Sequence, residues 1–253
     1  SGLGGISVLR ETVRLLPQED YLYFGDSLHA PYGVKSVDEV VRLSLENAAM
    51  LTARGIKALV VACNTVTSAA IATLREHYPQ LPIIGTEPAL KPAVERHPGG
   101  RILVMATAMT LSERKFSDLR EHYQQDAEII PLACSGLMEF VERGELSGPN
   151  LEAYLHEKLD LCLRQPVDAI VLGCTHYPIV EENFHECYPQ LHLINPALEQ
   201  ANAVKAYLAE QNALNPQKKG TFTICTSGDP QVYVNVGKRL GLFEASELKV
   251  VHI

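Results

Sequence analysis

Two stretches, LVVACNTVTSAAI at 59–71 and IVLGCTHYPIVEE at 170–182, decide the fold class of this sequence. Each reads as an apolar strand, a small residue, a cysteine, two polar residues and the start of a helix. A short apolar run that leads directly into a helix is typical of a parallel βαβ unit. Because the pattern occurs once in each half of the chain, we expect two α/β lobes that repeat one another, each with a cysteine where a strand ends.

The same alternation of short strands and amphipathic helices extends along the whole chain, so the sequence predicts an α/β fold with largely parallel sheets. Strands are expected at 21–25, 56–63, 81–85, 101–107, 128–133, 168–174, 191–195, 221–229 and 248–253. Helices are expected directly after the glycine-rich turn SGLGG at 1–5, between Ser36, as N-cap, and Gly55, at 65–77, 111–123 and 151–163, from Pro178, at 196–209 and at 230–240.

Two joins rich in proline, glycine and polar residues, at 87–101 and 212–220, suggest where the lobes divide. A single break near residue 90 would leave the first lobe short of strands, so we expect the C-terminal segment to return and complete it. The predicted first lobe is therefore 1–90 plus 206–253, and the second is 91–205. The active site is expected at the interface between the lobes.

Composition narrows the class of protein. The 253 residues carry a net charge of −8 and no basic run, so a nucleic-acid partner is not expected. The longest apolar runs are far shorter than a membrane span, and no signal peptide is seen, so we expect a cytoplasmic protein without a membrane partner. The six scattered cysteines include no C-x-x-C pair, which indicates reduced thiols and no metal site.

Cys63 and Cys174 are the candidates for chemistry. Both are expected at the carboxyl ends of strands, where open α/β sheets bind ligands, and both precede a helix N-terminus, which would lower a thiol pKa. A small buried cysteine that merely fills the strand end is the alternative for either one alone. A matched pair facing each other suits a reaction that needs an acid on one side and a base on the other.

Polar residues follow both cysteines. Asn64 and Thr65 follow the first, and Thr175 and His176 follow the second. Their hydrogen-bond donors suit a carboxylate ligand, although N-capping is the alternative for Asn and Thr. His176 could exchange a proton with the thiol two residues before it, or could simply be packed. The remaining cysteines lack a comparable setting and are expected to pack: Cys134, Cys162, Cys187 and Cys225.

The motifs ACNT (62–65), GCTHYP (173–178), SGLGG (1–5) and APYG (30–33) together resemble those of the glutamate racemases, in the aspartate/glutamate racemase superfamily. The resemblance extends from Ser1 to the TSGDP segment at 226–230. Aspartate racemases typically carry a glutamate where His176 stands, so the GCTH form favours glutamate as the substrate.

The resemblance implies two pseudo-symmetric lobes and a cofactor-independent isomerase that interconverts L- and D-glutamate by a two-base proton transfer. Cys63 would act on D-glutamate and Cys174 on L-glutamate, with His176 assisting Cys174. The implied role is cell wall biogenesis: D-glutamate for peptidoglycan synthesis, and thereby cell shape. No cofactor or metal is implied, and a homodimer is the assembly considered. The implied substrate-binding residues are Ser1, Tyr32, Gly33, Asn64, Thr65, Thr107, Thr175 and His176.

Two alternatives stay open from the sequence. One is an aspartate or hydantoin racemase of the same superfamily, and the other is a catalytically silent protein that binds an amino acid. The family usually has an aspartate directly before the serine of the first motif, at the end of a strand. We therefore expect such a strand, with its assisting aspartate, ahead of Ser1.

Overall fold

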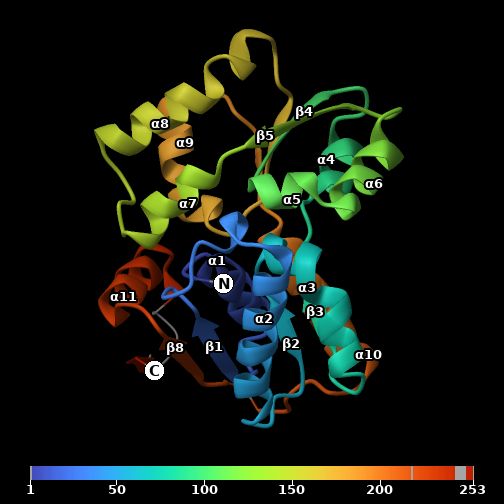
Figure 1. Ribbon diagram of the computed structural model, residues 1–253, viewed down its shortest axis with the longest axis vertical. Helices are drawn as coiled ribbons and strands as arrows, with labels where there is room; N and C mark the ends of the chain where they lie inside the picture. The colour runs from blue at the N-terminus through green and yellow to red at the C-terminus, as the bar shows by residue number, and fades with distance from the viewer. Residues whose placement is uncertain (1, 218, 243–248, 253) are drawn as a thin grey trace.

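The chain folds into two α/β lobes, one above the other in Figure 1. Figure 1 shows this computed structural model, which describes residues 2–217, 219–242 and 249–252. The second lobe, coloured green to yellow, lies above the first. The mixed α/β class with parallel sheets, expected from the sequence, is confirmed.

The second lobe is built on a parallel four-stranded sheet in the order β5-β4-β6-β7. Its central strands are almost completely buried, as strands covered by helices on both faces must be. Alternate residues point to opposite faces. Leu103 and Met105 therefore pack with α7, α8 and α9, whereas Ile102 and Val104 pack with α4 and α6. The strands are β4 (Arg101–Ala106), β5 (Glu128–Ala133), β6 (Ala169–Leu172) and β7 (Leu193–Ile194). The helices are α4 (Leu90–Arg96), α5 (Ala108–Ser112), α6 (Arg114–Tyr123), α7 (Ser135–Glu142), α8 (Pro149–Leu159) and α9 (Glu181–Cys187).

The first lobe contains two smaller parallel sheets, β1-β8-β9 and β2-β3. Tyr21 of β1 lies opposite Phe222 of β8, so the C-terminal segment does return to the first lobe. The strands are β1 (Tyr21–Gly25), β2 (Leu59–Val61), β3 (Ile83–Gly85), β8 (Phe222–Thr226) and β9 (Lys249–His252). The helices are α1 (Gly5–Leu15), α2 (Val37–Thr52), α3 (Asn64–His77), α10 (Ala197–Glu210) and α11 (Pro230–Arg239).

Residues of β1 and β2, which do not pair with each other, are among those that line a cavity of about 560 Å³. Apolar side chains of α1 and α2, among them Val8 and Leu51, contribute to its wall. Cys63 is also among the lining residues, so the cavity reaches the strand end that carries the first cysteine.

Local sequence patterns predicted most of the helices and strands, and the structure differs from the predictions at a few of them. Ser36 caps α2 as expected, because its Oγ accepts a hydrogen bond from the Glu39 N–H. The helix expected at 111–123 is broken at Glu113, whose backbone is extended, into α5 and α6. The helix expected from Pro178 begins as a 3-10 turn, η3 (Tyr177–Val180), before α9. Two further 3-10 turns are η1 (Tyr32–Val34) and η2 (Cys162–Arg164). Helices α4 and α7 were not expected.

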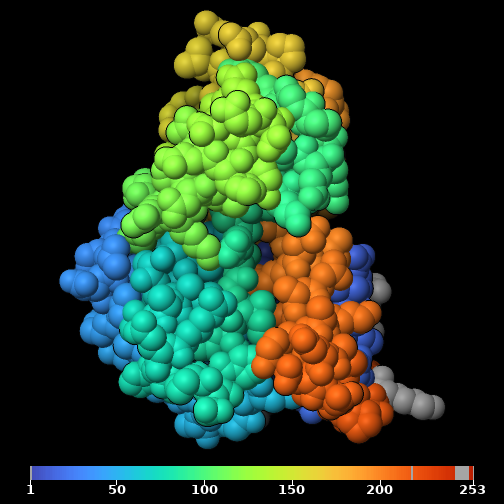
Figure 2. All heavy atoms as spheres, turned by 90° about the vertical axis from the view of Figure 1, so that its right-hand side faces the viewer, coloured from blue at the N-terminus to red at the C-terminus, as the bar shows by residue number. Residues whose placement is uncertain are grey.

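Helix α10 belongs with the first lobe by its packing. It lies along α1 and also contacts β3. In Figure 2 the orange atoms of this part of the chain lie beside the cyan atoms of the first lobe. The expected boundary at 206 would cut this helix, so we propose that the second lobe ends near residue 196 instead. The division into lobes otherwise stays as proposed from the sequence.

Candidate active site

The two cysteines of the repeated motif come together where the lobes meet. Cys63 follows β2 and is the N-cap of α3, and Cys174 follows β6 and Gly173. The Thr175 hydroxyl, next to Cys174, donates a hydrogen bond of 3.2 Å to the carbonyl of Ala62, next to Cys63. Each of the two cysteine residues is only 7% exposed. The strand ends of the two lobes thus face each other with one cysteine on either side.

The environment of Cys174 favours the neutral thiol. The pKa of Cys174 is raised to about 12, chiefly by burial and to a lesser extent by the charges of Cys63 and Glu142, and the backbone N–H of His176 opposes this rise. The sequence-based expectation of a lowered pKa is therefore wrong for Cys174. The physical reason is that η3 begins only at Tyr177, so Cys174 is not at an α-helix N-terminus and burial dominates.

Cys174, the histidine His176 and the carboxylate of Glu142 form a chain of close contacts. His176 Nδ1 lies 3.5 Å from the Cys174 sulfur, and His176 Nε2 lies 2.7 Å from Glu142 Oε1. This arrangement can move a proton between thiol and imidazole and stabilise the resulting imidazolium. Sequence reasoning predicted His176 but missed Glu142, because α7 itself was not predicted and a lone glutamate carries no motif.

Glu142 is held as a carboxylate by the donors that converge on it. Burial by itself would raise the pKa of Glu142, but the hydrogen bond and charge of His176, the Leu3 N–H and the Ser27 hydroxyl together hold that pKa below its usual value. The Leu3 N–H donates over 2.6 Å and the Ser27 hydroxyl over 2.8 Å. Glu142 therefore joins the first lobe, which supplies both of these donors, to the second.

Buried hydroxyl and amide groups lie beside Cys63. Thr65 Oγ1 is 3.1 Å from Thr107 Oγ1 and 3.5 Å from Thr110 Oγ1, and the latter two are 3.0 Å apart. This triangle crosses between the lobes, because Thr65 is on α3 and the other two flank or begin α5. Within the described residues, both polar side-chain atoms of Asn64 are buried without a hydrogen-bond partner. Such groups gain most from a polar ligand.

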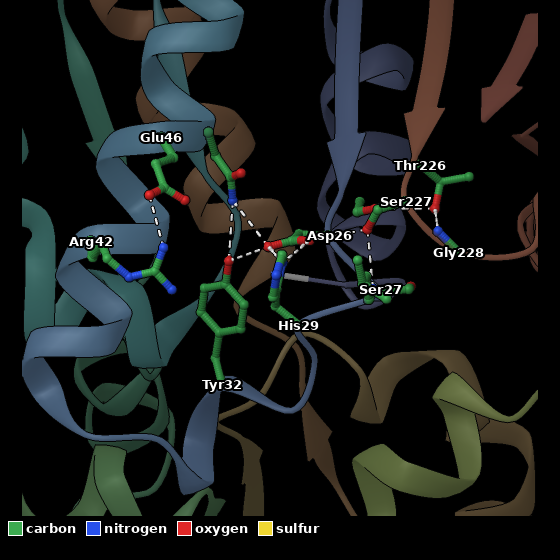
Figure 3. A network of polar contacts seen from close by, with 12 residues as sticks. Asp26, Ser27, His29, Tyr32, Arg42, Glu46, Thr226, Ser227 and Gly228 are labelled. Carbon is green, nitrogen blue, oxygen red and sulfur yellow. Dashed lines mark hydrogen bonds and ion pairs between the residues drawn. The ribbon is translucent and has the colours of Figure 1, made fainter. Parts of the chain in front are cut away.

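Tyr32 and Gly33 approach the site from the segment that follows β1. In Figure 3 the Tyr32 hydroxyl and the His29 ring both point toward Asp26. Tyr32 donates to Asp26 over 2.7 Å and accepts from Asn47 over 3.1 Å, so its hydroxyl is committed to this network rather than free for a ligand. A Cβ at Gly33 would lie 2.8 Å from Thr107 Cβ, so only glycine permits this close approach.

The sequence-based expectations for Ser1 and Cys134 remain to be compared with the structure. Ser1 lies outside the described residues. Cys134, expected to lack a comparable setting, in fact follows β5 and is the N-cap of α7, so that expectation is wrong. Its side chain is fully buried in the core of the second lobe, and burial raises the pKa of its thiol to about 12. All six cysteines are free thiols.

Neither a metal centre nor a membrane span is found in the parts of the chain that can be described. Across 2–217, 219–242 and 249–252, no three His, Cys, Asp or Glu side chains gather as metal ligands would. Over the same ranges, the helices are too short or too polar to cross a bilayer.

Comparison with known proteins decides the family. The family model described as Asp/Glu/Hydantoin racemase matches residues 4–204. The chain belongs to this racemase family. It is 46% identical over 243 residues to the glutamate racemase of Clostridium novyi, a match that covers 95% of this chain and 94% of the relative. The glutamate racemase of Clostridium perfringens is 43% identical over 242 residues, with 95% and 93% covered.

Solved structures of this family share the two-lobed fold. Glutamate racemase RacE1 of Bacillus anthracis matches with a TM-score of 0.87 at 27% identity, covering 100% of this chain and 94% of that one. The Francisella tularensis enzyme, solved with D-glutamate, matches at 0.84 and 26%, with the same coverage. The Escherichia coli enzyme, solved with L-glutamate and the activator UDP-MurNAc-ala, also gives 0.84 and 26%, covering 100% and 95%. The resemblance drawn from the sequence motifs is thus confirmed.

Proposed function

We propose that this racemase-family chain interconverts L- and D-glutamate by a two-base mechanism with Cys63 and Cys174 as the two bases. The observation that carries the proposal is the meeting of two matched strand-end cysteines across the lobe interface. One thiolate would remove the Cα proton, and the opposite thiol would deliver a proton to the other face of the planar intermediate. The named relatives at 43–46% identity support glutamate as the substrate.

More neighbouring groups support the role of Cys174 than that of Cys63. The raised pKa of Cys174 keeps it as a thiol near neutral pH, ready to deliver a proton. To act as a base it must first lose its proton, for which His176 Nδ1 is in position, and the Glu142 carboxylate would stabilise the imidazolium. Following the family resemblance, we assign Cys174 to L-glutamate and Cys63 to D-glutamate.

Neutral donors and acceptors would hold the substrate. Asn64 has both a donor and an acceptor free for a ligand among the described residues. The one hydrogen of the Thr175 hydroxyl is committed to Ala62, so Thr175 Oγ1 would accept from the substrate ammonium. Thr65 and Thr107 would turn hydroxyls toward a carboxylate, and the backbone of Tyr32 and Gly33 would complete the site. Ser1 stays among the proposed binding residues from the resemblance alone.

The decisive experiment incubates the purified protein with L-glutamate in D₂O and follows optical rotation together with deuterium at Cα. We expect rotation to be lost as deuterium enters, without added pyridoxal phosphate. Exchange with aspartate but not glutamate would instead indicate an aspartate racemase. Exchange with neither amino acid would indicate a binding protein.

Cys63→Ala and Cys174→Ala should each abolish racemisation, because one face of the intermediate then has no base. Cys134→Ala is the matched control, since Cys134 also follows a strand and caps a helix but lies in the core of the second lobe. It should racemise glutamate at the wild-type rate. A wild-type rate from Cys174→Ala would refute the two-base assignment.

The cellular setting follows from this activity. We propose that the protein works in the cytoplasm and supplies D-glutamate for peptidoglycan.

For its assembly we propose a homodimer that covers Leu28 and Val34, which are 71% and 66% exposed on the segment beside the site. Light scattering coupled to size-exclusion chromatography should give twice the chain mass of 27.8 kDa, and charged substitutions at these two positions should return it to that value.

A further inference from the structure

The turn that carries Cys174 and His176 has one backbone carbonyl that its own chain cannot satisfy. Successive residues here donate to the carbonyl three residues earlier: Tyr177 to Cys174 over 3.1 Å, and Ile179 to His176 over 3.0 Å. The residue between these two donors is Pro178, which has no N–H. The carbonyl of Thr175 is therefore left without the partner that the pattern would give it.

Ser7, on α1 of the first lobe, supplies the missing donor. Its hydroxyl lies 2.8 Å from the Thr175 carbonyl and 2.9 Å from the Gly4 carbonyl, so its one hydrogen is shared between them. The Gly4 carbonyl has a second donor, the Ser7 N–H. Among the hydrogen bonds of the described residues, the Thr175 carbonyl accepts from Ser7 only. Ser7 is completely buried, so water does not compete for this bond.

The contact links the two catalytic turns. Thr175 receives the bond from Ser7 through its carbonyl and passes a second bond, through its hydroxyl, to the carbonyl of Ala62. Ala62 precedes Cys63, and Thr175 lies between Cys174 and His176. The α1 backbone also approaches the His176 ring closely, because a Cβ at Gly4 would lie 2.4 Å from His176 Nδ1. The N-terminal end of α1 thus contacts the Cys174 turn at two points, Thr175 and His176.

We propose that Ser7 is a positioning residue, which replaces the N–H that Pro178 lacks and thereby fixes the Cys174–His176 turn relative to Cys63. It does not touch the substrate. The inference rests on the proposed racemase function, because its consequence is the placement of one base against the other. Loss of the hydroxyl leaves the buried Thr175 carbonyl unsatisfied and allows the turn to shift. Because the shift moves one base relative to the other, we expect it to lower kcat more than it weakens substrate binding.

The test begins with Ser7→Ala. We expect kcat to fall about 10- to 100-fold, with KM changed by no more than about twofold. The matched control is Ser44→Ala, which removes another buried serine hydroxyl, one that donates to Val40 within α2. It should keep the wild-type kcat. Equal losses in the two variants, or none in Ser7→Ala, would overturn the proposal.

Kinetic isotope effects separate positioning from general destabilisation. If only the proton transfer at Cys174 slows, the isotope effect with Cα-deuterated substrate should rise for the enantiomer that Cys174 deprotonates and fall for the other. A protein that is merely less folded would change neither value. Isotope effects that stay at the wild-type values, despite a lower kcat, would therefore overturn the proposal.

A second substitution tests the role of Pro178 directly. Pro178→Ala restores an N–H three residues beyond Thr175, so adding it to Ser7→Ala should recover a large part of the lost kcat. No recovery would contradict the replacement of one donor by the other.

If Ser7→Ala does not fold by far-UV circular dichroism, Ser7→Cys, with a similar shape and a weaker donor, should show the same opposite isotope effects. Unchanged effects there would count against the proposal, and wild-type protein that leaves glutamate unchanged would refute the proposed function itself.

Discussion

Single residues in this protein show how strongly burial outweighs local sequence. Cys63, Cys134 and Cys174 all follow strands, and a strand end before a helix suggests a reactive thiolate. The surroundings decide otherwise for two of them, because burial raises the pKa of both Cys134 and Cys174 to about 12. Cys174 has an imidazole within reach of its sulfur, whereas Cys134 lies in the second-lobe core, so the same local pattern is found beside a proton acceptor at Cys174 and in apolar packing at Cys134.

The Cys134 thiol predicts an alkaline loss of stability. Its pKa is raised from about 9 in the unfolded chain to about 12 in the folded protein, so the folded state holds this proton more tightly. Its contribution is complete below pH 9 and is lost as pH rises toward 12, by about 1–2 kcal/mol at pH 10. Urea unfolding at pH 7, 9 and 10 should show the free energy of unfolding falling more steeply for the wild type than for Cys134→Ala. Parallel curves for the two proteins would contradict this cause.

At the level of elements, the segment between β1 and α2 depends on one buried carboxylate. Asp26 accepts from Tyr32, from His29 Nδ1 over 2.8 Å and from Ser227 over 3.0 Å (Figure 3). Burial alone would raise the pKa of Asp26, but these hydrogen bonds hold it below its usual value. Asp26 therefore ties the segment that brings Gly33 to Thr107 back to β1 and to the residue that follows β8.

Asp26→Asn should loosen this segment and weaken substrate binding. The amide cannot accept from three donors as the carboxylate does, so we expect KM for glutamate to rise several-fold, by about the 3- to 30-fold that one weakened charge-assisted hydrogen bond is worth. Glu46→Gln is the control, because Glu46 is an exposed carboxylate paired with Arg42 on α2, away from the network. It should leave KM unchanged. Initial rates in both directions decide the matter, and an unaltered KM in Asp26→Asn would show that the network does not support the site.

At the scale of the whole molecule, the site exists only because two lobes meet. Thr65 with Thr107, Thr175 with Ala62, and Leu3 with Glu142 each join one lobe to the other. The first lobe is itself completed by the C-terminal segment, since β8 pairs with β1 about 200 residues earlier in the chain. A change in the relation of the lobes would therefore alter the distance between the thiols without changing either motif.

The sequence by itself determined the α/β class, most strand positions and the two cysteines with their polar neighbours. Those features arise from residues close together in the chain: apolar periodicity, a serine cap, and a strand that leads into a helix. Tertiary structure alone decided the contacts of Glu142, the donor that Ser7 provides, the Asp26 network and the direction in which the pKa of Cys174 is shifted. Leu3 and Glu142 are 139 positions apart, and Ser7 and Thr175 are 168 apart. Burial and contacts at that separation depend on how the lobes pack, which no local pattern encodes.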